Sequence, residues 1–150
     1  MSLIVLDSSV IAEYANVSGK FNVQANEVFN SINKNELRAI VAPPSLSEVY
    51  YVMFRLYEKA GAEQPEEKAS RLCEYLYYHP NIEVAEMSLS LIIEAARIKQ
   101  VFRLALTDCY VLALSEQKGC KAVFRHKEEE MKKVMNRLNK RFQIVFLEDY

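Results

Sequence analysis

The chain has 150 residues, with 19 lysines and arginines against 20 aspartates and glutamates, and a formal net charge of -1. A protein that coats nucleic acid without specificity is usually strongly basic, so this chain must meet any polyanion through a local patch. Its three glycines and four prolines supply little turn chemistry, which argues against an all-β sandwich or barrel.

The cysteines and the N-terminal residues indicate in which cellular compartment the protein is expected. Cys73, Cys109 and Cys120 are odd in number and form no CxxC pair, so they indicate neither a disulfide framework nor a zinc knuckle. Only four apolar residues precede Asp7, too few for a signal peptide, and no apolar run reaches the ~18 residues of a membrane span. We therefore expect a cytoplasmic protein with no membrane partner, folded over residues 1–150 as a single domain.

Taken in chain order, the apolar residues alternate between two kinds of pattern. Short continuous runs, typical of parallel strands covered on both faces, predict strands at residues 3–6, 39–42, 82–84, 122–124 and 144–147. Helical spacing predicts helices at residues 8–16, 21–34, 43–60, 65–79, 88–102, 107–117 and 126–140. This alternation predicts an α/β fold, a three-layer α/β/α domain with a central parallel sheet of about five strands and an inserted helical hairpin at residues 43–79.

Three carboxylates occur where predicted strands give way to helices. Asp7 ends the first strand, Glu48 lies in the first turn of the helix after the second strand, and Asp108 opens the helix at 107–117. Ligands of open parallel sheets bind at the carboxyl ends of the strands. Converging carboxylates there suit a hard cation such as Mg²⁺ or Mn²⁺, which polarises a phosphoryl oxygen and activates a water.

Each acid alone also has a plainer interpretation as a helix cap, because acids at helix N-termini are stabilising. Ser45-x-x-Glu48 has the spacing of a capping box, and Asp7 could cap the helix after the first strand. Thr107 could cap a helix that has Asp108 at its first position. The conjunction favours the metal site, because all three major strand exits carry an acid.

Three segments carry a family resemblance by their order and spacing. Residues 3–12 read LIVLDSSVIA, residues 42–49 read APPSLSEV, and residues 104–114 read LALTDCYVLAL. Together they resemble the PIN-domain family, in particular its toxin-like members of the VapC type. The resemblance implies a metal-dependent endoribonuclease for single-stranded or loop RNA. Its implied site residues are the catalytic and metal-binding Asp7, Glu48 and Asp108, with Ser9 and Thr107 in support.

The chain departs from the family pattern after the fourth predicted strand. PIN domains usually continue there with Thr-x-Asp, where this chain has Phe124-Arg125-His126. His126 is either a nitrogen ligand, which would suit Mn²⁺, or a surface residue. Glu128 either turns into the site or is an ordinary acid of a first helical turn. The missing acid leads us to expect at most one well-held metal, since a pair of ions needs more carboxylate.

Other features concern partners and rival functions. Candidate RNA-phosphate ligands, which could equally line a solvated surface, are Arg55, Arg97, Lys99, Arg103 and Arg125. In toxin-like PIN proteins the helical hairpin supports homodimers and receives an antitoxin segment, so the resemblance implies both partners.

The main rival function is a catalytically silent PIN domain that binds RNA or protein. A receiver-type domain normally needs two adjacent acids after its first strand, where this chain has Ser8-Ser9 following Asp7.

Overall fold

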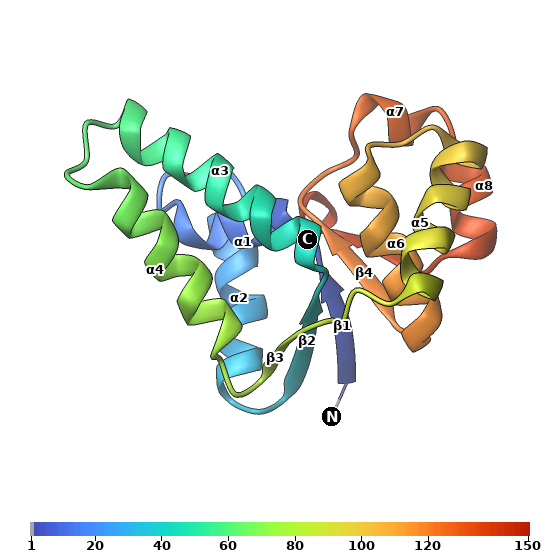
Figure 1. Cartoon of the computed structure of the whole chain (residues 1–150), viewed down its shortest axis with the longest axis horizontal. Helices are drawn as coiled ribbons and strands as arrows, with labels where there is room; N and C mark the ends of the chain where they lie inside the picture. Colours follow the sequence, from blue (N-terminus) through green and yellow to red (C-terminus); the bar gives the residue numbers. More distant parts are fainter. Residues whose placement is uncertain (1) are drawn as a thin grey trace.

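A five-stranded sheet forms the centre of the protein, whose computed structural model describes residues 2–150. The strand order is β3-β2-β1-β4-β5, and every neighbouring pair is parallel (Figure 1). The strands are β1 (Ser2–Leu6), β2 (Leu37–Val41), β3 (Ile82–Val84), β4 (Lys121–Phe124) and β5 (Ile144–Phe146). The predicted α/β class and parallel sheet are confirmed.

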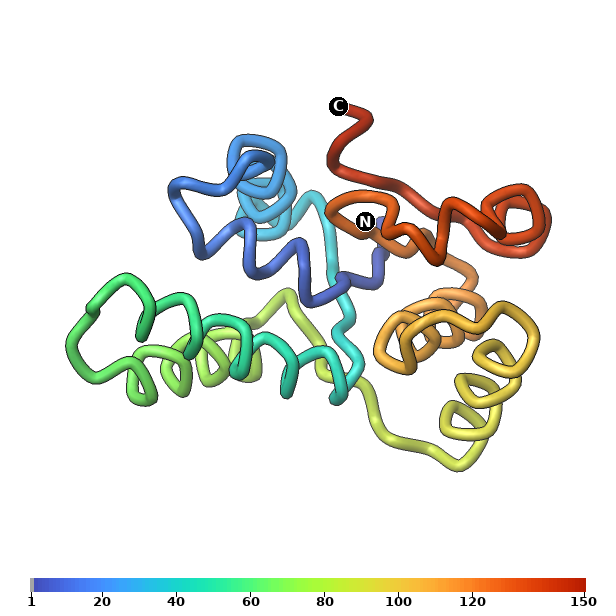
Figure 2. The backbone as a smooth tube through the Cα atoms, turned by 90° about the horizontal axis from the view of Figure 1, so that it is seen from above, coloured from blue at the N-terminus to red at the C-terminus, as the bar shows by residue number. Residues whose placement is uncertain are grey.

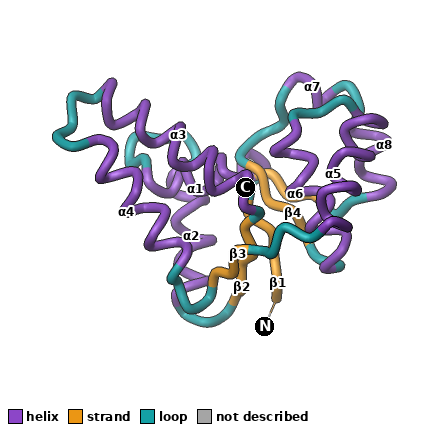
Figure 3. The backbone as a smooth tube through the Cα atoms, viewed as in Figure 1, coloured by secondary structure: helices purple, strands orange, loops and turns teal. Residues whose placement is uncertain are grey.

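Helices connect the strands (Figure 3), and a 3₁₀ turn at Leu147–Asp149 follows β5. The helices are α1 (Ser8–Ala15), α2 (Asn22–Asn33), α3 (Pro43–Lys59), α4 (Pro65–Tyr77), α5 (Leu89–Phe102), α6 (Leu106–Lys118), α7 (Glu129–Lys132) and α8 (Met135–Arg141). Within residues 2–150 none of them is both long and apolar enough to cross a membrane.

The helices cover both faces of the sheet, because successive side chains of each strand point to opposite faces. Val5 and Phe124 belong to a core shared with α5, α6 and α8. Leu6 and Val123 belong to a second core shared with α1, α2 and the α3–α4 hairpin. Figures 1 and 2 show these two groups of helices on opposite sides of the strands. Full burial of each such side chain stabilises the fold by roughly 1.5–3 kcal/mol.

The predicted hairpin is confirmed as α3 and α4, which pack against each other between β2 and β3. Pro43 and Pro44 occupy the first helical positions of α3, where a missing N–H costs nothing and the fixed φ suits the helix. α3 therefore starts directly after β2, with only Ala42 between them. This short connection brings the second turn of α3 to the carboxyl edge of the sheet.

The single helix predicted at 126–140 is wrong, because the chain forms the two short helices α7 and α8 there. Between them Val134 leaves the helical region, with φ -124° and ψ 12°. Met131 and Leu138, on either side of the break, both belong to the core around α5 and α6. Tertiary packing thus overrides the apolar spacing that suggested one continuous helix.

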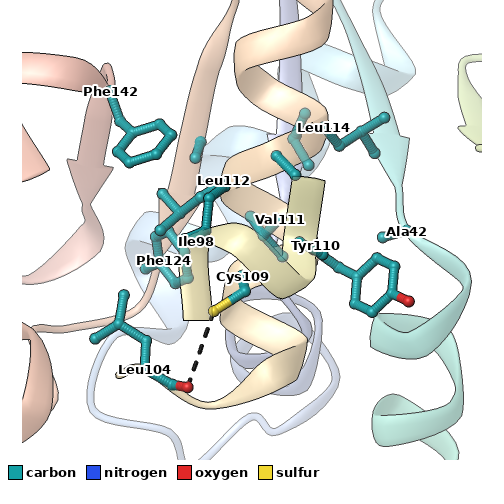
Figure 4. Packing of buried hydrophobic residues seen from close by; sticks show 14 of the residues in the cluster. Ala42, Ile98, Leu104, Cys109, Tyr110, Val111, Leu112, Leu114, Phe124 and Phe142 are labelled. Atoms are coloured by element: carbon teal, nitrogen blue, oxygen red, sulfur yellow. Dashed lines mark hydrogen bonds between the residues drawn. The ribbon is translucent and has the colours of Figure 1, made fainter. Parts of the chain in front are cut away.

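The start of α6 is anchored in the core beneath the sheet edge (Figure 4). Every residue from Cys109 to Ser115 is buried, so this helix is apolar on all sides, as a central helix must be. The Cys109 thiol donates a hydrogen bond to the carbonyl of Leu104, with Sγ 3.8 Å from the oxygen. These contacts fix the first turn of α6, which carries Asp108.

Candidate active site

Five carboxylates line one pocket where β1, β2 and β4 end and α1, α3 and α6 pass. The pocket has a volume of about 340 Å³, and Arg125 is the one cationic side chain among the described residues that line it. Its acids are Asp7, Glu48, Asp108, Glu128 and Glu130. The structure therefore brings together Asp7, Glu48 and Asp108, which are far apart in the sequence. The prediction that Asp108 follows a strand is wrong, because α6 comes after α5 with only residues 103–105 between them.

Asp7 is both a helix cap and a buried acid of this pocket. One carboxylate oxygen, Oδ2, accepts hydrogen bonds from the backbone N–H of Ser9 at 3.0 Å and from its hydroxyl at 2.5 Å. The other oxygen, Oδ1, is buried and has no hydrogen-bond partner among the described residues. Burial raises the pKa of Asp7 to about 6, although the hydrogen bonds from Ser9 act to lower it.

Glu48 links three helices, because it accepts hydrogen bonds from hydroxyl groups of α1 and α6. The Ser8 hydroxyl donates to Oε1, and Thr107 Oγ1 lies 3.2 Å from Oε2. Glu48 belongs to the second turn of α3 rather than the first, because that helix starts at Pro43. Two hydroxyl donors hold this carboxylate beside the pocket.

The capping roles considered for α3 and α6 are not found. α3 has Ala42 at its N-cap and no side-chain cap, and the hydroxyl of Ser45 is buried without a partner. Ala105 precedes α6 without a side-chain cap, so Thr107 lies inside the helix and donates to Glu48 instead. Of the three acids Asp7, Glu48 and Asp108, only Asp7 caps a helix with its side chain.

Asp108 lies in the first turn of α6 and has the most perturbed carboxyl group of the pocket. Its pKa is raised to about 8, first by burial and then by the negative charges of Asp7, Glu48, Glu128 and Glu130. Mutual repulsion of this kind is expected where several carboxylates share one pocket with little compensating positive charge. The pocket therefore disfavours a further negative charge, and at neutral pH it favours the protonated form of Asp108.

The donor set fits a hard divalent cation. Among residues 2–150 no group of three or more His, Cys, Asp or Glu side chains is arranged so that it could hold a metal ion as it stands. The pocket nevertheless offers only oxygen donors from its acids, which Mg²⁺ and Mn²⁺ prefer. The unpartnered Oδ1 of Asp7 and the raised pKa of Asp108 are the features a bound cation would relieve.

The residues that follow the fourth strand have different surroundings, although His126 Nε2 lies 3.7 Å from Oε1 of Glu128. Phe124 is buried in the core, where its ring centroid lies 6.1 Å from that of Phe146. His126 is outside the described pocket lining, and its Nδ1 accepts a hydrogen bond from Arg125 Nε at 2.9 Å. Glu128, the N-cap residue of α7, does line the pocket, as one of its two predicted interpretations required.

Sequence reasoning missed Glu13, a buried acid of α1. Its Oε1 lies 3.3 Å from Nη1 of Arg125, and its Oε2 accepts a hydrogen bond from the backbone N–H of Phe21 at 3.1 Å. Only 6% of the Glu13 side chain is exposed. The available signal was a single acid between Val10 and Tyr14 in an otherwise apolar helix, and a lone acid of that kind has no specific meaning.

Gly19 is expected to be intolerant of a side chain because of this buried acid. A Cβ atom at position 19 would lie 2.1 Å from Oε2 of Glu13 and 3.1 Å from the carbonyl oxygen of Asn16. We predict that Gly19→Ala destabilises the protein by about 1–3 kcal/mol, the usual cost of forcing extra atoms into a packed site. Urea unfolding checks this, with the exposed Ser18→Ala as control; equal midpoints for both variants would refute it.

The five predicted phosphate ligands have different surroundings. Arg97 pairs with Glu94 at 3.6 Å, Lys99 donates to the carbonyl of Leu104 at 2.8 Å, and Arg103 ends α5 in a left-handed conformation. The remaining two, Arg55 and Arg125, line a second pocket of about 420 Å³ between α1 and α3. This pocket shares Ala12, Val52 and Arg125 with the acidic pocket.

Comparisons with known proteins agree with this arrangement. Residues 4–136 match the family model described as PIN domain. VapC20 of Mycobacterium tuberculosis, described as a Sarcin-Ricin loop cleaving toxin, is similar in structure, with a TM-score of 0.62 and 15% identity over 79% of this chain and 86% of its own.

Two further solved structures are also similar. VapBC-1 of nontypeable Haemophilus influenzae has a TM-score of 0.63 and 12% identity over 97% of this chain and 98% of its own. FitAcB of Neisseria gonorrhoeae has a TM-score of 0.61 and 13% identity over 98% and 99%, respectively. No curated protein matches the chain by sequence.

Proposed function

The chain belongs to the PIN domain family, and from this premise we propose that it is a metal-dependent endoribonuclease. The observation that carries the proposal is the convergence of Asp7, Glu48 and Asp108, from three distant segments, on one pocket. Stability of the fold does not explain why three acids share a pocket, because ionised carboxylates that lie close together repel one another. Binding of a cation, and through it of an RNA phosphodiester, does explain it.

Each residue has a distinct role in the proposed mechanism. Asp7 and Asp108 bind Mg²⁺ or Mn²⁺, which when bound polarises a phosphoryl oxygen and makes water a stronger nucleophile. Glu48, held by the hydroxyl groups of Ser8 and Thr107, binds the cation or orients the attacking water. Water is the nucleophile of the proposed reaction, which therefore has no covalent intermediate.

Ser9 is expected to matter through Asp7. Its hydroxyl donates to Oδ2 of Asp7 and accepts from the backbone N–H of Arg125 at 3.1 Å. We predict that Ser9→Ala weakens Mn²⁺ binding by about 10-fold to 100-fold, the usual effect of removing a hydrogen bond to a metal ligand. Isothermal titration calorimetry measures this, with Ser18→Ala as control. Unchanged Mn²⁺ affinity in Ser9→Ala would contradict the role.

The chemistry is tested by the ends of the products. Hydrolysis by water predicts a 5′-phosphate and a 3′-hydroxyl after incubation of a single-stranded RNA with Mg²⁺ or Mn²⁺. Attack by the neighbouring 2′-hydroxyl of the RNA would leave a 2′,3′-cyclic phosphate instead. Cyclic ends, or cleavage that persists in EDTA, would contradict the proposal.

We further propose that the protein is the toxin of a toxin–antitoxin pair and acts in the cytoplasm as a homodimer. Support comes from its similarity to VapBC-1 and FitAcB and from the exposed aromatic side chains of the hairpin, Tyr51, Tyr77 and Tyr78. Exposed aromatic groups mark protein interfaces. Expression of the chain should arrest growth, and co-expression of the gene encoding its antitoxin should restore growth. Arrest by an Asp7→Asn variant would contradict a nuclease toxin.

The rival function is a catalytically silent domain that binds RNA. One observation favours it: the fourth position supplies Arg125 to the pocket, where the family pattern has an acid nearby. An arginine there can bind phosphate without metal. The two functions differ in outcome, because the silent domain binds RNA and leaves it intact with either metal.

A further inference from the structure

Arg125 is held at both its backbone and its side chain. Its backbone N–H donates to the Ser9 hydroxyl, which also donates to Asp7. Its guanidinium group contacts Glu13 through Nη1 at 3.3 Å and donates from Nε to His126 Nδ1 at 2.9 Å. Three contacts at separate points therefore fix this side chain relative to the acid at the end of β1.

The guanidinium group of Arg125 has N–H donors that are not used by its contacts with Glu13 and His126. Arginine has five N–H donors, and the bonds to Glu13 and His126 use two of them. The other three make no hydrogen bond to the described residues, and 34% of the Arg125 side chain is exposed. A planar fork of free N–H groups matches the paired oxygens of a phosphate.

The place of Arg125 also favours an anionic ligand. It lines both the acidic pocket and the neighbouring pocket that contains Arg55 and Lys59. A polyanion approaching the five acids meets strong repulsion, which a cation at their margin reduces. Glu13 and Glu58 line this neighbouring pocket too, against the three cations Arg55, Lys59 and Arg125. Glu13 neutralises part of the charge of Arg125, but its side chain is only 6% exposed and also accepts a hydrogen bond from the backbone N–H of Phe21.

We propose that Arg125 is the phosphate-binding residue of this site, where it holds the phosphodiester adjacent to the cleaved one, and that Glu13 is its positioning residue. This inference rests on the proposed ribonuclease function. In this proposal Arg125 neutralises part of the negative charge of the RNA. A second cation, held by the fourth acid that this chain lacks, would otherwise do so. From Arg125 the RNA strand then continues between α1 and α3 toward Arg55 and Lys59.

The first test is RNA affinity without cleavage. Binding of a short fluorescent single-stranded RNA is measured in EDTA for the wild type, Arg125→Ala, Arg125→Lys and the control Arg38→Ala. Arg38 is an exposed arginine on β2, toward the opposite end of the strand. We expect Arg125→Ala to weaken binding about tenfold and to reduce the salt slope by about 0.7. Arg125→Lys keeps the charge but not the fork, so its affinity falls in between.

The second test depends on the sign of an effect. Glu13→Gln removes a negative charge near the RNA, so simple electrostatics predicts tighter binding. If Glu13 positions Arg125, the same change weakens RNA binding by about threefold, because the charge-assisted bond to Nη1 is lost. In cleavage assays with metal, Arg125→Ala should raise KM more than it lowers kcat. Thermal unfolding confirms that each variant is folded.

The outcomes separate this inference from the proposed function. Equal RNA affinities for Arg125→Ala and Arg38→Ala, tighter binding by Glu13→Gln, or no saturable binding by the wild type would each overturn the role of Arg125. None of these results decides whether the wild type cuts RNA with metal. Conversely, a wild type that binds RNA through Arg125 and never cuts it would refute the ribonuclease and leave the phosphate site standing.

Discussion

Asp108→Asn is expected to abolish activity while making the metal-free protein more stable. The pKa of Asp108 is raised to about 8 by burial and by four neighbouring acids, so its ionised form is unfavourable in the folded protein. Asparagine removes this charge, and we expect a gain on the order of 2 kcal/mol in the free energy of unfolding at pH 8 in EDTA. The same change should lower metal-dependent RNA cleavage by at least about 100-fold.

The control for this prediction is Glu129→Gln, an acid of α7 that lies between two pocket acids but is itself outside the described pocket lining. Its side chain is 80% exposed and pairs with Lys132. We expect neither stability nor cleavage to change appreciably, as for an exposed ion pair. Asp108→Asn with lower stability in EDTA and unchanged cleavage would show that the acid is a structural residue.

The metal-free protein should lose stability as pH rises between about 4 and about 8. The pKa values of Asp7 and Asp108 are higher in the folded protein than in the unfolded chain, about 6 and about 8 against 3.8. In this range the folded state therefore binds more protons, so the free energy of unfolding falls with rising pH. For Asp7 alone the shift of roughly two units corresponds to about 3 kcal/mol.

Urea unfolding in EDTA across this pH range measures the effect, and a divalent cation should reverse it. Mg²⁺ or Mn²⁺ binds the ionised carboxylates and so competes with protons, which makes the stabilisation by metal largest at high pH. The double variant Asp7→Asn, Asp108→Asn should flatten the pH dependence and lose the response to metal. A pH dependence unchanged by the double substitution would place its origin elsewhere in the chain.

Strand and helix order could be predicted from the sequence because the apolar runs are short, continuous and separated by helical spacing. The runs at 3–6 and 82–84 correspond closely to β1 and β3. The break between α7 and α8 could not be predicted, because residues 129–141 contain no glycine or proline and the spacing of Met131 and Leu138 also fits one continuous helix.

The candidate site was predictable to the extent that it follows from topology. β1 and β2 are parallel and end at one edge of the sheet, so Asp7 and the start of the helix that carries Glu48 lie close together once the sheet is known. The place of Asp108 does not follow from this rule, because α6 comes after α5 and not after a strand. Hydrogen-bond partners do not follow from topology. The bond from Thr107 to Glu48 and the contact between Glu13 and Arg125 join residues 59 and 112 positions apart. Neither pair has a local sequence signature.

The most direct test of the central claim is cleavage of a mixed-structure RNA by the purified protein in Mn²⁺, Mg²⁺ or EDTA, with Asp7→Asn beside the wild type. Asparagine preserves the size of the residue and an oxygen that can cap α1, so the variant should fold. We predict cleavage by the wild type with metal, none in EDTA, and none by Asp7→Asn. Intact RNA under every condition, with RNA binding equal in both proteins, would contradict the ribonuclease and favour the silent binding domain.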